Sequence, residues 1–271
     1  MLNRVLLYVL LLLVAALCLA PIGLLLSGSL QSAPDLYRGA SIVPTLLHGE
    51  NYQHVWFESK FYTYFVNSIV YALIVVPATL IAASMAAFGF ARLEFAGKQV
   101  LLLLVLTVLI VPASASFIPL YSVLVNLHLV NTRIGYVVPL ISGGLPIGIF
   151  ILQRFFAAIP RDLEEAAVID GASLPTIFLY VMVPLVGPGL AAVAILTLVS
   201  TWNEFLLALV VFRDQALMPV QQGLVQFNST ERPEQQLMLA AAAIAILPVL
   251  LAYMVAQRAI IAGVMAGAVR G

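Results

Sequence analysis

Six long apolar segments dominate this sequence and decide what kind of structure the chain can form. They cover residues 5–26, 65–90, 99–120, 134–153, 185–211 and 238–261. A run of about 20 apolar residues is long enough to cross the hydrocarbon core of a bilayer as an α-helix. Only 9% of the residues are charged, whereas a soluble domain carries roughly 25%. We therefore predict an all-α polytopic membrane protein with six transmembrane helices in a single domain, residues 1–271.

The start of the first apolar segment is also compatible with a cleaved signal peptide, because Arg4 precedes it. The apolar run continues past Pro21 to Leu26, however, and about 22 residues are enough to span the bilayer. We expect a retained first helix. Cys18 lies within this segment and is the single cysteine of the chain, which excludes an internal disulfide.

Residues 161–170 contrast with the rest of the chain, because five of these ten positions are charged. A helix of about ten residues spans only about 15 Å, half of a bilayer core. The sequence thus predicts a short polar helix at a membrane surface. Asp162 can cap its start together with Glu165, Gly171 can end it in the left-handed conformation, and Ser173 can cap a second helix. From the residues alone, a helix that merely connects two spans is an equally good interpretation.

A motif in this region resembles a known family. The sequence Glu165-Ala166-Ala167-x-x-Asp170-Gly171-Ala172, followed by Pro184, is similar to the EAA loop of ABC importer permeases. The pattern is long, mixed in composition and placed between two apolar segments. Val183 departs from it, since leucine is common before the proline. The resemblance implies that residues 161–184 form a cytoplasmic loop whose short helix is a coupling helix, which docks into a cleft of a separate ATPase.

The resemblance also implies roles for individual residues of this loop. Glu165 and Asp170 are expected to fix the helix and its turn, Gly171 to permit the bend, and Ala166 and Ala167 to give a close-packing face. The chain has no match to the P-loop pattern G-x-x-x-x-G-K-[ST]. We therefore expect no cofactor on this chain, with ATP and Mg bound by the partner ATPase.

The fifth apolar segment carries a charge at membrane depth, Glu204, directly after Trp202 and Asn203. An ionised side chain at the centre of a spanning helix costs roughly 2.5–3.5 kcal/mol on insertion scales, so we expect it to face the bundle interior or a watery path. Residues 202–209 resemble the corresponding span of carbohydrate-importing permeases. These three residues are translocation-path candidates; alternatively, Glu204 lies nearer an interface and bonds to a neighbouring span. Asn67 is a fourth candidate, although a hydrogen bond between helices suits it better.

The last residues, 257–271, resemble the tail of the same carbohydrate permeases, with Arg270 where lysine is frequent. The likeness covers nearly the whole chain and is to the MalG-like type. It implies a permease subunit of an ATP-driven bacterial importer for a carbohydrate, with a disaccharide or oligosaccharide expected. The expected partners are a second homologous permease, two ATP-binding subunits and an extracytoplasmic substrate-binding protein.

The distribution of basic residues is compatible with a bacterial inner-membrane protein whose two termini are cytoplasmic. With residues 161–184 inside, seven basic residues lie inside: Arg4, Arg92, Lys98, Arg154, Arg161, Arg258 and Arg270. Five lie outside: Arg38, Lys60, Arg133, Arg213 and Arg232. This bias is weak under the positive-inside rule, so the resemblance decides the orientation.

Two other kinds of function are weighed against the importer. Metal or covalent catalysis has no support, because the three histidines lack ligand spacing and no catalytic motif is present. We therefore predict neither a catalytic residue nor a metal site. An ion-gradient-driven secondary transporter or channel would explain Glu204 and the prolines and glycines of the fourth segment, which contains Pro139, Gly143, Gly144 and Pro146. It would leave the charged helix near residue 165 without a role.

Overall fold

The computed structural model describes residues 2–38, 46–228 and 234–268. Four of its helices are long and apolar enough to cross a membrane. They are α1 (Leu2–Ser29), α4 (Phe61–Arg92), α7 (Arg133–Ala157) and α14 (Gln235–Ala268). Two bent pairs of helices meet the same criterion if each pair counts as one span. The predicted all-α polytopic class is therefore confirmed.

The third predicted span, residues 99–120, is divided between several helices. α5 (Lys98–Thr107) continues into the 3₁₀ turn η2 (Val108–Ile110), and α6 (Ala113–Asn126) follows at 108° to this first part. Val111 and Pro112 have extended backbones between them. Proline disfavours helical geometry in the residue before it and donates no hydrogen bond itself, so the chain bends where the sequence predicted a continuous helix.

The fifth predicted span, residues 185–211, also differs from the structure. α9 (Leu174–Thr176), the π-helical η3 (Ile177–Met182) and α10 (Val183–Leu185) form one stretch, and α11 (Gly187–Trp202) follows at 79°. Proline is acceptable in the first turn of a helix, and Pro188 lies there in α11. A second break after Trp202 separates α11 from α12 (Leu206–Val211).

The chain forms two compact units, and α4 and α14 contribute residues to both. The first unit consists of residues 1–66 and 218–248. It contains α1, α2 (Ala33–Arg38), α3 (Glu50–Gln53), η1 (His54–Glu58) and α13 (Val220–Val225). That residues 1–271 act as one domain stays a prediction.

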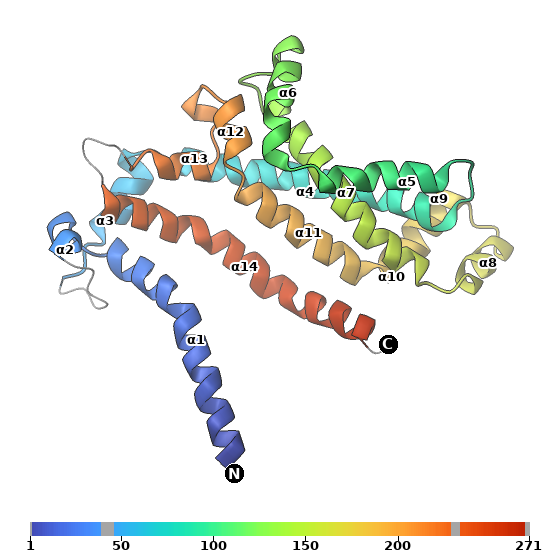
Figure 1. Ribbon diagram of the computed structural model, residues 1–271, viewed down its shortest axis with the longest axis horizontal. Coiled ribbons are helices and arrows are strands. Elements are labelled where there is room, and N and C mark those ends of the chain that lie inside the picture. The colour runs from blue at the N-terminus through green and yellow to red at the C-terminus, as the bar shows by residue number, and fades with distance from the viewer. Residues whose placement is uncertain (1, 39–45, 229–233, 269–271) are drawn as a thin grey trace. The chain divides into compact units, whose positions relative to one another are not determined.

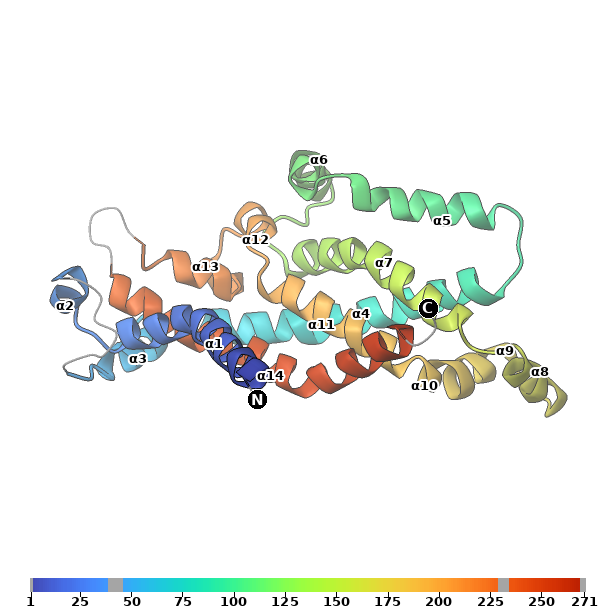
Figure 2. The same ribbon diagram turned by 60° about the horizontal axis from the view of Figure 1, so that its bottom comes forward.

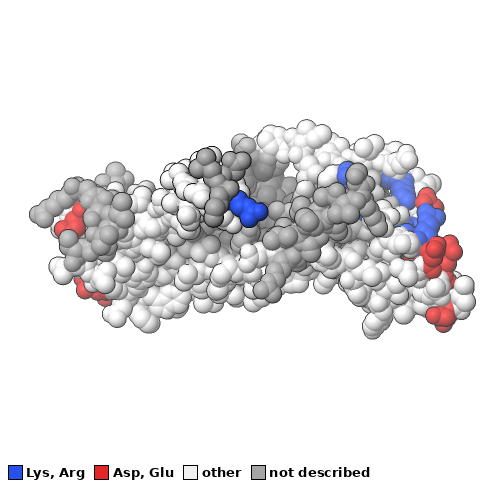
Figure 3. Space-filling view, turned by 90° about the horizontal axis from the view of Figure 1, so that it is seen from below, with Lys and Arg blue, Asp and Glu red and all other residues white. Residues whose placement is uncertain are grey.

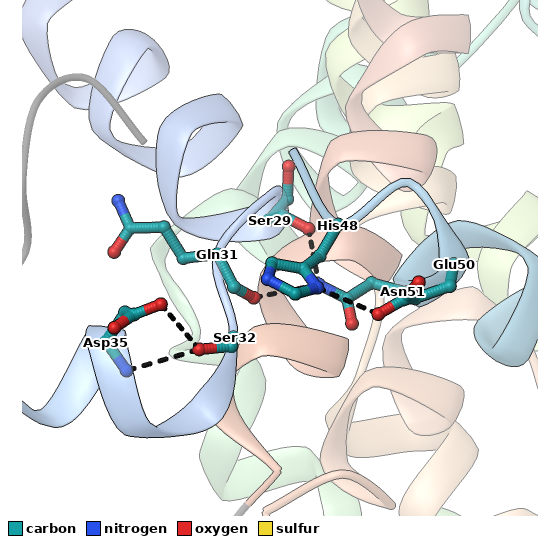
Figure 4. Close-up of polar contacts among 7 residues, drawn as sticks. All are labelled: Ser29, Gln31, Ser32, Asp35, His48, Glu50 and Asn51. Atoms are coloured by element: carbon teal, nitrogen blue, oxygen red, sulfur yellow. Dashed lines mark hydrogen bonds and ion pairs between the residues drawn. The ribbon is translucent and has the colours of Figure 1, made fainter. Parts of the chain in front are cut away.

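Polar contacts fix the segment after α1 within the first unit (Figure 4). The Asn51 amide donates to the carbonyls of Ser29 and Gln31, at 2.9 and 3.0 Å. The Ser32 hydroxyl donates to Asp35 at 2.7 Å. The Asn51 amide thus satisfies the Ser29 carbonyl at the end of α1, a position that lacks a partner within the helix.

The second unit consists of residues 67–217 and 249–271. Its apolar core lies between α4, α7, η3 and α11, and α7 and α11 lie side by side in both ribbon views (Figures 1 and 2). Phe88 packs edge-on against Phe156, with ring centroids 5.8 Å apart. Gly148 permits close approach of the helices, since a Cβ there would lie 2.9 Å from the Cβ of Ala83. This core supports the charged helix described next.

Candidate functional site

The short charged helix is present as α8 (Asp162–Ile169), as the sequence predicts. Its N-cap residue is Arg161 and no side chain caps it, so the predicted capping box of Asp162 and Glu165 is wrong. The Arg161 carbonyl instead accepts the backbone N–H groups of Glu164 and Glu165, at 2.9 and 3.1 Å. The acidic residues still lie in the first turn, where the positive end of the helix dipole favours them.

The end of α8 is formed by Gly171, as predicted. Its φ is +84°, a left-handed conformation that glycine adopts at little cost. Gly171 N–H donates to the Val168 carbonyl at 3.0 Å, and Ala172 N–H donates to the Ala167 carbonyl at 2.9 Å. This pair of bonds is the Schellman arrangement of helix ends. Ser173 begins α9 without capping its backbone, because its hydroxyl bonds to the hydroxyl of Thr176.

The two sides of α8 have different environments. On the inner side, Ala167 and Ala172 pack against the apolar core of the second unit. On the outer side, Glu165 and Ala166 are exposed, and Ile169 is 85% exposed. Of the two alanines of the motif, Ala167 packs on the core and Ala166 is exposed; that they give a close-packing face to a partner stays a prediction.

Charged side chains gather where α8 lies, at one end of the second unit (Figures 1 and 3). Among the described residues Asp162, Glu165 and Asp170 make no ion pair, whereas Glu164 lies 2.8 Å from Arg92. From the sequence, Arg92 was only one of the basic residues expected on the cytoplasmic side, with no connection to α8. The one signal available was a basic residue in the last turn of α4.

Three of the translocation-path candidates, Trp202, Asn203 and Glu204, lie at the end of α11 that is farther from α8 (Figure 1). Trp202 ends α11 and is 3% exposed, so its ring is buried. The Asn203 amide donates to the Val199 carbonyl at 3.0 Å, and Asn203 remains exposed. The Glu204 carboxylate accepts the backbone N–H of Leu207 at 2.6 Å. The charge expected at membrane depth thus has a hydrogen-bond donor at the start of α12.

Asn67 makes a hydrogen bond to another segment of the chain, the kind of structural contact that the sequence favoured for it. Its side chain is buried, and its amide donates to the Ala216 carbonyl at 2.8 Å. Nearby on α4, the Tyr71 hydroxyl donates to the Leu217 carbonyl at 2.6 Å. These bonds attach α4 to the segment after α12. That Asn67 lines a translocation path stays a prediction.

Comparison with known proteins identifies the family. Residues 78–265, more than half of the chain, match the family described as binding-protein-dependent transport system inner membrane component. The chain is 32% identical over 265 residues to the diacetylchitobiose uptake system permease protein NgcG of Streptomyces coelicolor, covering 97% of this chain and 88% of that one. It is 34% identical to the trehalose transport system permease protein SugB of Mycobacterium tuberculosis, covering 96% and 95%.

A solved structure supports the same assignment. A chain of a bacterial ABC transporter involved in the import of the acidic polysaccharide alginate superimposes with a TM-score of 0.83. The two chains are 25% identical, and the match covers 95% of this chain and 96% of the other. From this likeness and the family match, the chain belongs to the binding-protein-dependent transport system inner membrane components, the multi-pass permease subunits of ABC importers.

Proposed function

We propose that this permease carries a carbohydrate, that α8 is its coupling helix, and that a separate ATPase subunit drives it. Support for the substrate class comes from the names of relatives, which transport diacetylchitobiose, arabinooligosaccharides or trehalose. All are sugars of two or more units. Family membership argues against the ion-gradient-driven alternative. The observation that carries the coupling role is the outer side of α8, which presents both apolar and acidic side chains and which the described residues leave exposed.

The outer side of α8 is unsuited both to lipid and to water alone. Ile169 and Val168 are 85% and 61% exposed, and the acids Asp162, Glu165 and Asp170 of the same helix and its end are exposed as well. Full burial of a branched aliphatic side chain contributes about 1.5–3 kcal/mol, and the charges keep this helix out of the hydrocarbon. A protein partner that covers the apolar residues and leaves the acids at its rim satisfies both requirements, as in ordinary interfaces.

The proposed path uses the break after α11. Asn203 and Glu204 lie where helical hydrogen bonding is interrupted, and such breaks in membrane proteins occur where backbone lines a cavity or is buried in protein. Substrate hydroxyls can bond to the exposed Asn203 amide. Movement of α8 would rock α10 and α11 and open the path alternately to each side of the membrane, a rigid-body transition.

The proposed assembly holds a second homologous permease, two ATP-binding subunits with ATP and Mg, and an extracytoplasmic binding protein. We place both termini in the cytoplasm, on the same side of the membrane as α8. Two basic residues counted for this orientation, Arg270 and Arg232, lie outside the described residues. The exposed apolar surface of α1 supports burial of this helix in lipid or against a partner subunit. Its apolar side chains, such as Leu12 and Leu17, are 70% and 76% exposed.

The coupling role is tested by placing a charge on the outer side of α8. In Ile169→Asp we expect loss of ATPase co-purification, because an aspartate cannot enter an apolar pocket without a partner. The matched control is Leu47→Asp, since Leu47 is 73% exposed and lies in the first unit. Equal recovery of the ATPase with Ile169→Asp and with the unmodified permease would refute α8 as the docking helix.

A further inference from the structure

Arg92 is a nearly buried charge at the junction of three helices in the second unit. It is the last residue of α4, and its side chain is only 5% exposed. Arginine is rarely buried unless it is paired, because removing the charge from water is costly. Its surroundings therefore must compensate the charge, and they do so from two other elements.

The first compensating element is the end of α7. The Arg92 Nη2 group donates to the Phe156 carbonyl at 2.7 Å and also to the Ile159 carbonyl. α7 ends at Ala157, so these carbonyls belong to its last turn and to the residues just after it. Carbonyls at a helix C-terminus lack intrahelical partners and form the negative end of the dipole. The guanidinium fills this site, and α4 is thereby joined to α7.

The second compensating element is the first turn of α8. The Arg92 Nε atom lies 2.8 Å from Glu164 Oε1, and the Glu164 side chain is 21% exposed. The N–H does not point along this line, so the contact is an ion pair without an aligned hydrogen bond. Because the pair is largely shielded from solvent, it is screened by salt far less than a surface pair.

The two attachments of α8 lie at its two ends. The Arg92–Glu164 pair holds the N-terminal turn, and Ala167 and Ala172 hold the C-terminal turn against the core. Without the pair, α8 would keep its packing on the core at the C-terminal end and its chain link to α7, but its N-terminal turn would lose its contact with α4. A force applied to its outer side would then reach α4 and α7 only through these apolar contacts and this link, without the direct ion pair.

We propose that Arg92 is the positioning residue that transmits movement of α8 to α4 and α7. This inference rests on the proposed coupling function of α8. A planar guanidinium suits the task, because its Nη2 group bonds to the end of α7 while its Nε atom pairs with α8, which the single ammonium of lysine does less well.

The test uses the complete importer in lipid vesicles, with the partner permease, ATPases and binding protein. ATP hydrolysis is measured with and without binding protein supplied with a mixture of trehalose, arabinotriose and diacetylchitobiose, and the ratio of the two rates is the readout. In Arg92→Gln we expect assembled complex in normal amount and a ratio lowered about fivefold or more, the lower end of couplings between sites. Arg92→Lys should retain part of the ratio.

The matched control is Glu94→Gln. Glu94 forms an ion pair with Lys98 at 3.3 Å, close to Arg92 in the chain but with 78% of its side chain exposed and no contact to α8 among the described ion pairs. Its substitution should leave the ratio unchanged. If Arg92 were merely structural, Arg92→Gln would lower both rates in proportion to the amount of complex, and the unchanged ratio would overturn the proposal.

The same assay separates failure of this inference from failure of the proposed function. If Ile169→Asp abolishes ATPase binding while Arg92→Gln keeps the full ratio, the inference about Arg92 fails alone. If the unmodified importer retains no ATPase, or shows no stimulation by binding protein and the sugar mixture, the proposed carbohydrate-import function fails, and this inference fails with it.

Discussion

Gly171 allows the backbone at the end of α8 to be tested without disturbing a side-chain contact. Its φ is +84°, and a Cβ added there would meet nothing within 4 Å. The cost of Gly171→Val is therefore a backbone cost. A left-handed conformation costs a residue with a Cβ roughly 1–2 kcal/mol, and valine, which is β-branched, is a genuine outlier there.

This cost acts on the two hydrogen bonds that close α8. Gly171 and Ala172 donate them to Val168 and Ala167, and Ala167 is also a contact with the core. Since about 1.4 kcal/mol is a factor of ten in an equilibrium, the strain shifts the balance between closed and frayed helix ends by roughly five- to thirtyfold. We expect basal ATP hydrolysis to persist in Gly171→Val and its stimulation by the loaded binding protein to fall.

The assay is the ratio of ATP hydrolysis with and without binding protein and sugars, in vesicles. Gly97→Val is the control, because Gly97 has a φ of +80° and equally open surroundings but lies in the turn before α5. Gly171→Asn should retain most of the ratio, since asparagine tolerates this conformation. A full ratio in Gly171→Val, or the same loss in Gly97→Val, would show that the closed end of α8 is not needed for coupling.

Two further predictions concern the supporting structure. Gly148→Ala should lower the apparent melting temperature of the purified permease, because the new Cβ would lie 2.9 Å from the Cβ of Ala83 and overpacking costs about 1–3 kcal/mol; Gly143→Ala, with nothing within 4 Å, should not lower it, and equal melting of the two would contradict the packing described. Glu204→Ala should lower the same temperature, because the hydrogen bond that its carboxylate accepts from Leu207 N–H contributes about 1.5–3 kcal/mol, as bonds to charged groups do. Glu204→Gln keeps an acceptor and should retain the melting temperature of the unmodified permease. An unchanged melting temperature in Glu204→Ala would show that this hydrogen bond contributes nothing to stability.

The sequence predicted those features that depend on neighbouring residues. The concentration of charge in residues 161–170 excluded a span and indicated a short helix, and Gly171 ended it as glycine commonly does. The long apolar runs located α1, α4, α7 and α14. The residues assigned to coupling, Glu165, Ala166, Ala167, Asp170 and Gly171, all lie in α8 or its turn.

Features that depend on tertiary structure were missed or placed wrongly. Apolar composition continues through the bends at Pro112 and Gly187, so hydropathy alone cannot show that the helices turn there. Glu204 was interpreted as an isolated charge, because its hydrogen-bond partner, the Leu207 N–H, becomes available only after the break that ends α11. Arg92 and Glu164 are far apart in the chain, and no local pattern links them. Contacts of this kind are set by packing and not by periodicity.

The length of α8 explains why its attachments matter more than its own sequence. A helix of eight residues is far below the roughly 12–15 residues at which isolated helices become even marginally stable. Its order therefore depends on Glu164 at one end, the Schellman turn at the other and Ala167 on the core. A helix ordered in this way before a partner binds spares the partner the entropy of folding it. The same contacts join α8 to α4 and α7, so the residues that order α8 are also those that we propose transmit its movement.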